Sequence, residues 1–403
     1  MNTESSERSG SIYNPAVAPS GDPAKKRLAI FLPSFEKGGV ERMMVNLARG
    51  FAALGHSPDF VVKEASSPYL EALPETVKLI ELDNFHHDVQ VAAALYLEQA
   101  APYAILTSKE ENDDIAVRAK ERSGTSTRII MRAPVHVTSR LKHKRRGPLK
   151  TWKTYLNLKR VMSKADAVVA VSEGVALDIS TITGIPLEKI HVIRNPVITP
   201  ELKDLATAPV DHEWFTQKDI PVLIAIGRLG RQKNFETLIK AFNEMRTKIG
   251  CRLIILGEGR RRSSLEKLVS RLGLNEYVEL PGFVVNPFAY LAKSDLFVLS
   301  SLWEGSPNAL AEALALGIPV VSTDCDSGPH EILQDGRYGK LVPVNDIEKL
   351  ADAMVRTLSN PLPSEILREA VTEYTTVRAA RAYLDVLLND GNFGQTSIEN
   401  TVS

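Results

Sequence analysis

The sequence predicts an α/β protein with two domains, each containing a parallel sheet between layers of helices. The chain has 403 residues, which is long enough for two domains with separate cores. In both halves, short apolar strands alternate with longer amphipathic helices. Several strands lead into glycine-containing loops, and open parallel sheets bind ligands at that end of their strands.

The composition is that of a soluble globular protein. Apolar residues make up 44% and charged residues 24% of the chain. The formal net charge is zero, so the overall charge argues neither for nor against nucleic-acid binding. Cys251 and Cys325 are far apart and match no metal-binding spacing, so we expect them to be reduced thiols of a cytosolic protein.

The clearest local unit is the stretch 295–319, which predicts a strand, a loop and a helix. An apolar strand at 296–299 gives way to a loop with Gly305, and we expect a helix with Ser306 as its cap and Pro307 at its first position. The first turn of a helix has backbone N–H groups without internal partners, and the helix dipole adds positive charge there. The unit therefore predicts an anion site at the start of the helix.

Two glutamates flank this anion site at different distances. Glu304 lies in the loop before the helix, and Glu312 lies about five residues beyond Pro307, roughly 7 to 8 Å along the helix at 1.5 Å per residue. A diphosphate at the helix start, with a ribose further along, would bring the ribose hydroxyls to Glu312. Glu304 would then face the group attached beyond the phosphates.

The loops after two other strands are expected to add positive charge and glycines to the predicted site. The apolar strand at 222–226 is followed by Arg228 and Lys233. Two cations at a strand end can neutralise a diphosphate, and arginine can bind it in a bidentate manner. In the first half of the chain, a strand leads into Gly38 and Gly39, whose backbone can approach a ligand closely.

Three motifs on these residues resemble one enzyme family. E-G-x-P-N-x-x-x-E-A begins at Glu304, G-R-x-x-x-x-K begins at Gly227, and G-G-x-E begins at Gly38. Together they resemble the family-4 retaining glycosyltransferases, and the resemblance covers residues 28 to about 388. It implies the GT-B fold, an α/β fold in which two Rossmann-like domains face a central cleft.

The resemblance implies transfer of a hexose or N-acetylhexosamine from a nucleotide-sugar donor to an acceptor hydroxyl, with retention at the anomeric carbon. The expected acceptor is lipid-linked or a polysaccharide, in the synthesis of exopolysaccharide, capsule or lipopolysaccharide. His136, just past a strand at 128–131, is either a structural histidine or the counterpart of a histidine near the donor sugar. The implied catalytic residues are Glu304, His136, Arg228 and Lys233, and the implied donor-binding residues are Gly38, Gly39, Arg228, Lys233, Val284, Glu304, Gly305, Ser306, Pro307, Asn308 and Glu312.

Two other functions remain open at this point. A nucleotide-sugar 2-epimerase shares the fold but needs further acid and base groups in the cleft, which the sequence does not place. A noncatalytic homologue that binds sugar nucleotides or membranes is disfavoured by the intact motif cations and glutamates. Asp324-Cys325-Asp326 would hold a metal in transferases of another fold, but the predicted phosphate site is already cationic. We therefore expect no metal and no other cofactor.

The segment 140–160 contains nine lysines and arginines and no acidic residue. Trp152, Tyr155 and several leucines lie among these basic residues, and a helix is expected after Pro148. A solvated basic helix and a nucleic-acid surface are alternatives, and the neutral overall charge weakens the second. Basic and aromatic residues together favour docking on an anionic membrane surface. We therefore expect a cytoplasmic protein, peripherally associated with the inner face of the membrane, that binds no nucleic acid.

The composition and the resemblance together divide the chain into segments. The N-terminal residues are polar and contain no apolar signal-peptide core, and the C-terminal residues are also polar. The expected segments are a disordered tail at 1–26, an acceptor domain at 27–198, a linker at 199–219, a donor domain at 220–370, a helix at about 371–388 that packs back on the first domain, and a disordered tail at 390–403.

Overall fold

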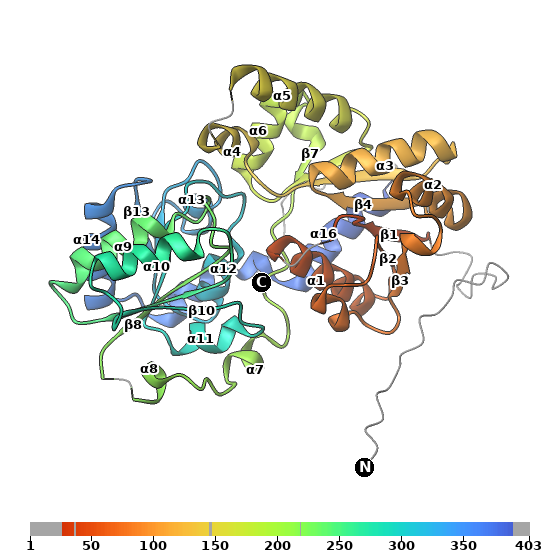
Figure 1. Cartoon of the computed structure of the whole chain (residues 1–403). Coiled ribbons are helices and arrows are strands. Elements are labelled where there is room, and N and C mark those ends of the chain that lie inside the picture. Colours follow the sequence, from red (N-terminus) through yellow and green to blue (C-terminus); the bar gives the residue numbers. More distant parts are fainter. Residues whose placement is uncertain (1–25, 36–37, 145–146, 218, 390–403) are drawn as a thin grey trace, which may run out of the picture.

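The computed structural model describes residues 26–35, 38–144, 147–217 and 219–389, which form two α/β lobes (Figure 1). The first lobe contains a seven-stranded sheet in the order β3-β2-β1-β4-β5-β6-β7, and the second a six-stranded sheet in the order β10-β9-β8-β11-β12-β13. All paired strands of both sheets are parallel. The predicted fold class, two parallel α/β domains, is therefore confirmed.

The strands lie close to the apolar runs that predicted them. Those of the first sheet are β1 Leu28–Phe31, β2 Asp59–Val62, β3 Lys78–Glu81, β4 Ala104–Ser108, β5 Arg128–Ala133, β6 Ala167–Ala170 and β7 Ile190–Val192. Those of the second sheet are β8 Val222–Ile226, β9 Arg252–Leu256, β10 Val278–Gly282, β11 Leu296–Leu299, β12 Val320–Thr323 and β13 Lys340–Val342.

Helices cover both faces of each sheet. Those of the first lobe are α1 Gly39–Ala53, α2 Val89–Ala100, α3 Glu110–Ser123, α4 Val137–His143, α5 Pro148–Met162 and α6 Glu173–Thr183. Those that follow are α7 Leu202–Ala206, α8 Glu213–Thr216, α9 Phe235–Arg246, α10 Arg262–Arg271, α11 Pro287–Lys293, α12 Asn308–Ala315, α13 Pro329–Ile332, α14 Ile347–Ser359, α15 Ser364–Glu369 and α16 Thr376–Leu388. None of the described helices combines the length and the apolar character needed to cross a bilayer.

Continuous apolar strands are explained by burial on both sides of the sheet. In β1, Ala29 and Phe31 belong to one core cluster, while Leu28 and Ile30 belong to a second. Successive side chains of a strand point to opposite faces, so a sheet between two layers of helices needs apolar residues at every position. This is why the sequence predicts these strands well.

The C-terminal helix packs against α1 of the first lobe and begins later than predicted. The sequence predicts it at about 371–388, whereas α15 ends at Glu369 and α16 begins only at Thr376. Between them the chain runs beside the start of the linker, and the backbone N–H groups of Val197 and Ile198 both donate to Tyr374 O at 3.0 and 2.9 Å. Two chain segments therefore cross between the lobes side by side, which local sequence patterns do not reveal.

Segment boundaries differ from the predictions in small ways. The linker at 199–219 contains two short helices, α7 and α8, although its sequence shows no helical period. Residues 1–25 and 390–403 of the predicted tails lie outside the described residues. Lys26, assigned to the first tail, donates a hydrogen bond of 3.0 Å to Leu388 O and lies over the Tyr103 ring.

A buried carboxylate in the first lobe gives a prediction about stability and pH. Asp113 lies in the first turn of α3, is fully buried and contacts the Thr107 hydroxyl. Burial raises the pKa of Asp113 to about 8, against a weaker opposing effect of the hydrogen bond from Thr107. An unfolded aspartate has a pKa of about 3.9, so the folded state holds a proton that the unfolded state releases between these two values.

We expect stability to fall as the pH rises from about 4 to about 8, by up to about 1.4 kcal/mol for each pH unit from this group. Asp113→Asn removes this contribution, so its melting temperature should depend less on pH than that of the wild type. Glu121→Gln, at an exposed position of the same helix, is the control and should keep the wild-type slope. Parallel profiles for wild type and Asp113→Asn, measured by thermal unfolding from pH 5 to pH 9, would contradict the prediction.

Candidate active site

The loop after β11 brings the two lobes into backbone contact. A Cβ atom at Gly305 would lie 2.3 Å from Pro134 O and 3.0 Å from Val135 Cα, both in the loop after β5. Beside this contact, the backbone N–H of His136 donates to Glu304 O at 3.3 Å. Gly305 was predicted as part of an anion site, and the structure gives it a second role as the point where the two domains touch.

Helix α12 begins one residue later than predicted. Ser306 was expected as the cap and Pro307 as the first helical residue, but Pro307 is the N-cap and Asn308 is the first residue of the helix. No side chain caps the helix from within its own loop. Instead, Asn195 of the first lobe donates its amide to Ser306 O at 3.2 Å and to Asn308 Oδ1 at 2.7 Å. The first lobe therefore provides the contacts that fix the start of α12.

Glu304 is held by three donors on neighbouring segments. Its carboxylate accepts hydrogen bonds from Lys233 Nζ at 2.7 Å, Ser301 Oγ at 2.6 Å and Gln232 Nε2 at 3.2 Å. Its side chain is 8% exposed. Lys233 was predicted to bind a diphosphate and Glu304 to bind the group beyond it, and the structure places these two side chains in direct contact.

Glu312 is a buried carboxylate with one oxygen occupied and one open. It is 1% exposed, and its Oε1 accepts a hydrogen bond from Arg42 of α1 across the gap between the lobes. Its Oε2 is buried and has no hydrogen-bond partner among the described residues. Burial raises the pKa of Glu312, against the opposing effects of Arg42 and Lys233. An unsatisfied buried carboxylate oxygen is costly, so this atom is suited to a hydroxyl donor from a ligand.

The glycine loop of the first lobe lies over the start of α12. Asn308 Nδ2 donates to Gly39 O at 3.3 Å. A Cβ atom at Gly38 would lie 3.5 Å from Arg228 Nη2, so the exposed Arg228 side chain reaches from the second lobe to this loop. The structure thus brings together the predicted residues Gly38, Gly39, Arg228, Lys233, Glu304, Gly305, Ser306, Pro307, Asn308 and Glu312.

His136 lies beside this cluster as the N-cap of α4. Its Nδ1 accepts a hydrogen bond of 3.3 Å from Ser139 N, lies 3.0 Å from Ser139 Oγ and is 3.6 Å from Asp178 Oδ2. Val284, one of the predicted donor-binding residues, follows β10 and packs on an apolar cluster with Leu310 of α12.

Sequence reasoning missed several polar residues that hold the site. Arg42 pairs with Glu312, and Asn195 links the two lobes while accepting a hydrogen bond of 2.7 Å from Arg132 Nη2. Asp178 accepts from the backbone N–H of Val137 at 2.6 Å and so fixes the start of α4. These contacts join residues far apart in sequence, so no local pattern indicated them.

Asp324 and Asp326 lie in the loop after β12. In the parts of the chain that the structure describes, no three His, Cys, Asp or Glu side chains are placed to hold a metal ion. Asp326 accepts a hydrogen bond from Ser139 Oγ, and Cys325 donates to Ser301 O at 3.2 Å. Cys251 and Cys325 are both free and buried, and burial raises the pKa of each thiol.

Comparison with solved structures defines the fold class. The structure is similar to a glycosyltransferase from Rickettsia africae ESF-5, with a TM-score of 0.72 and 18% identity over 90% of this chain and 98% of that one. It is also similar to Anabaena Alr3699/HepE in complex with UDP and glucose, with a TM-score of 0.71 and 18% identity over 90% of this chain and 100% of that one. At these identities the likeness shows the fold, which is GT-B.

Sequence comparison identifies the family. Residues 37–200 match the family described as Glycosyltransferase Family 4, and residues 220–360 match the one described as Glycosyl transferases group 1. The two matches follow one another along most of both lobes. The chain therefore belongs to the family-4, group 1 glycosyltransferases.

Curated relatives match over parts of their length. The N-acetylgalactosamine-N,N'-diacetylbacillosaminyl-diphospho-undecaprenol 4-alpha-N-acetylgalactosaminyltransferase of Campylobacter jejuni is 32% identical over 54% of this chain and 56% of its own length. The lipopolysaccharide core biosynthesis glycosyltransferase LpsE of Rhizobium meliloti is 31% identical over 55% of this chain and 64% of its own length. An uncharacterized glycosyltransferase of Methanocaldococcus jannaschii is 42% identical over 36% of each chain. The chain thus spans between about a third and two thirds of these relatives.

The contact at Gly305 gives a prediction about domain closure. Gly305→Ala places a Cβ atom against backbone atoms, which cannot move aside as a flexible side chain can. The variant should hold the lobes apart, with a larger radius of gyration in X-ray scattering than the wild type. Gly250→Ala is the control, because a Cβ atom there meets nothing within 4 Å. A Gly305→Ala protein with the wild-type scattering profile would show that the two backbones do not set the distance between the lobes.

Proposed function

We propose that the protein transfers a hexose or N-acetylhexosamine from a nucleotide-sugar to an acceptor hydroxyl, with retention at the anomeric carbon. The observation that carries this proposal is the buried, unpartnered Oε2 of Glu312 on a helix whose start is flanked by Arg228 and Lys233. A ribose hydroxyl can donate to that oxygen while the diphosphate lies at the helix start.

Arg228, Lys233 and the backbone amides after Gly305 act on the leaving diphosphate in this proposal. They stabilise the negative charge that develops as the bond from the anomeric carbon to the phosphate oxygen breaks. The acceptor oxygen forms the new bond on the same face of the sugar, and its proton passes to the leaving phosphate oxygen. In this proposal, His136 and the Glu304 carboxylate contact the sugar, and the backbone hydrogen bond between the two residues supports this by making them neighbours. The positive charge comes from the chain itself, so we propose that no metal is required.

The relatives support the substrate class. The Anabaena structure contains UDP and glucose, and the Campylobacter relative is named for transfer of N-acetylgalactosamine to a sugar-diphospho-undecaprenol. The Rhizobium relative is named for lipopolysaccharide core biosynthesis. For this chain we propose a lipid-linked or polysaccharide acceptor in glycan synthesis at the cytoplasmic face of a membrane.

The two motif glutamates should have separable effects. Glu312→Gln removes the charge offered to the ribose and should weaken nucleoside-diphosphate binding by about 1.5–3 kcal/mol, that is about 10- to 100-fold in calorimetry. Glu304→Gln should lower turnover while nucleotide binding is kept. Glu365→Gln, 82% exposed at its side chain, is the control and should change neither quantity. If Glu304→Gln weakened nucleotide binding and Glu312→Gln lowered only turnover, the roles assigned to the two glutamates would be wrong.

The activity itself is tested with a labelled nucleotide-sugar. The proposal expects a glycosylated acceptor and free nucleoside diphosphate, formed equally with or without a chelator. A product that is still a nucleotide-sugar, epimerised at C2, would identify a 2-epimerase. Binding without any product would identify a noncatalytic homologue. If a chelator abolishes activity and added Mg²⁺ or Mn²⁺ restores it, the reaction needs a metal. Asp324 and Asp326 would then be the candidate metal ligands.

Helix α5 presents an exposed apolar face that supports membrane docking. Leu149, Trp152 and Leu156 are 75%, 58% and 46% exposed, and their spacing places them on one side of the helix. The segment 140–160 has nine lysines and arginines, but not all of them are free to bind lipid headgroups. Arg140 pairs with Glu110, and Arg160 pairs with Asp114. Arg145 and Arg146 lie outside the described residues. The exposed lysines of α5 are Lys150, Lys153 and Lys159.

We expect the protein to cosediment with vesicles of anionic lipid and less with neutral ones. Each basic residue near such a surface contributes about 1 kcal/mol, so changing Lys150, Lys153 and Lys159 to serine should reduce binding on the order of 100-fold. Replacing Leu149 and Trp152 with serine should remove the binding that persists at high salt. Serine at Lys203, Lys267 and Lys340, exposed on the second lobe and its linker, is the control. Equal recovery of all three variants would leave α5 as a solvated basic helix.

A further inference from the structure

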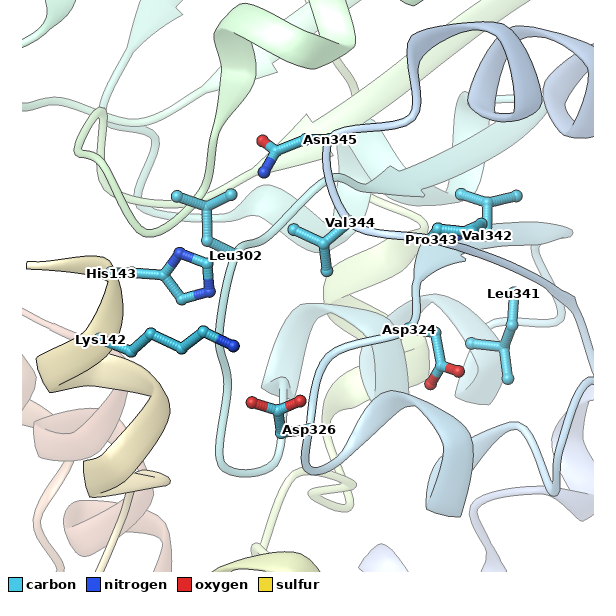
Figure 2. Close-up of a pocket in the computed structure, with 10 residues that line it drawn as sticks. All are labelled: Lys142, His143, Leu302, Asp324, Asp326, Leu341, Val342, Pro343, Val344 and Asn345. Carbon is cyan, nitrogen blue, oxygen red and sulfur yellow. The ribbon is translucent and has the colours of Figure 1, made fainter.

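The interface between the lobes is lined differently at its two sides. At one side, Figure 2 shows a cavity of about 630 Å³ into which Lys142 and His143 extend from α4, opposite the loops after β12 and β13. At the other side, α1 of the first lobe packs against α11 and α12 of the second lobe. Met43 of α1 is 1% exposed and belongs to an apolar cluster that consists mainly of second-lobe residues. The first lobe thus takes part in the packing around the helix that carries Glu312.

Arg42, near the start of α1, makes the charged contacts on that side. Its guanidinium group pairs with Glu312 Oε1 of α12, and its guanidinium carbon lies 5.3 Å from the centre of the Phe288 ring of α11. A guanidinium over an aromatic ring is attracted to that ring, so Phe288 restricts the positions open to the arginine. One first-lobe side chain, 22% exposed, is therefore held by two helices of the second lobe.

Glu312 needs a positive partner to remain ionised. Its side chain is 1% exposed, and a buried carboxylate loses the solvation that favours its charged form. Burial raises the pKa of Glu312, and Arg42 opposes this rise more strongly than Lys233 does. Arg42 thus favours the ionised carboxylate, which offers both of its oxygens as hydrogen-bond acceptors.

The same contact orients the carboxylate. Arg42 binds Oε1 of Glu312, and the remaining oxygen, Oε2, is buried without a partner among the described residues. A carboxylate held at one oxygen cannot turn freely, so Oε2 keeps a fixed place beside α12. A ligand hydroxyl that reaches this place meets an acceptor whose position and charge both depend on Arg42.

We propose that Arg42 is a positioning residue for donor binding: it holds Glu312 with one oxygen turned to the ribose, so that selection of ribose over deoxyribose depends on the first lobe. This inference rests on the proposed function, in which a ribose hydroxyl donates to Glu312 Oε2. It adds that the second lobe does not recognise the ribose by itself, because the residue that prepares its carboxylate belongs to α1.

The test compares ribonucleoside diphosphates with their 2′-deoxy and 3′-deoxy analogues by calorimetry. UDP, GDP and ADP are tried on the wild type first, and the nucleotide that binds most tightly is kept for the variants. The wild type should prefer the ribonucleotide to at least one of its deoxy analogues. Arg42→Ala should weaken binding of the ribonucleotide about tenfold or more and change binding of that analogue by no more than about twofold, so that the preference for ribose is lost.

Three further variants separate this role from a general effect on folding. Arg49→Ala is the matched control and should keep the wild-type preference, because Arg49 lies on the same helix but pairs with Glu201 of the linker. Arg42→Lys keeps the charge and should keep part of the preference. In a Glu312→Gln background, Arg42→Ala should cause no further loss of preference, since the effects of coupled residues are not additive.

Melting temperatures are measured on the same proteins, and Arg42→Gln takes the place of Arg42→Ala if the latter does not fold. An equal loss of affinity for the ribonucleotide and its deoxy analogues would overturn the proposal, because the arginine would then act on the lobes and not on the ribose. A wild type that binds the ribose and deoxyribose forms equally would overturn it too. If the wild type binds none of the three nucleoside diphosphates, the proposed function itself fails, which is a different result from either of these.

Discussion

The arrangement of the active site depends on the contact between two loop backbones, at Gly305 in one lobe and Pro134 in the other. With no side chain at Gly305, the loop after β11 lies against the loop after β5, where any Cβ atom would meet Pro134 O at 2.3 Å. His136 follows the contact on one side and Glu304 precedes it on the other, so their backbones form a hydrogen bond across the lobes. Residues from two separately folded sheets thus become neighbours, and the absence of a side chain at Gly305 is one condition for this.

Polar contacts further along the same face fix the angle between the lobes. Glu331 of α13 accepts hydrogen bonds from the backbone N–H groups of Glu173 and Gly174 at 2.8 and 3.0 Å, and from Arg194 at 2.6 Å. Burial opposes ionisation of Glu331, but the hydrogen bonds outweigh it and hold the pKa of the carboxyl below its ordinary value. A charged carboxylate from one lobe therefore satisfies the start of α6 in the other. Such directional contacts specify orientation more sharply than apolar packing does.

The sequence predicted what depends on local patterns. Strands such as 222–226 and 296–299 are continuous apolar runs because both faces of each sheet are buried, and the glycines and cations follow those strands directly. The start of α12 was predicted one residue too early, and its contacts with Asn195, more than a hundred residues away, could not be read from local patterns. The Arg42–Glu312 pair and the break before α16 were missed for the same reason, since each exists only once the two lobes have met. For the cavity at Lys142 and His143, no local pattern indicated that α4 faces the loops after β12 and β13.

The charged side chains of the site differ in how completely other side chains of the protein pair with them, and this difference bears on how a donor binds. Lys233 and Glu304 form an ion pair. Arg42 also forms an ion pair with Glu312, but it contacts only one of the two carboxylate oxygens. In the proposed function, a diphosphate competes with Glu304 for Lys233, and the displaced carboxylate becomes free to accept hydrogen bonds from the donor sugar. A ribose hydroxyl would displace no hydrogen bond at Glu312 Oε2, because this buried atom has no partner among the described residues. In that proposal, nucleotide binding and the hydrogen bonding of Glu304 are coupled through Lys233, while Ser301 and Gln232 keep their hydrogen bonds to the carboxylate.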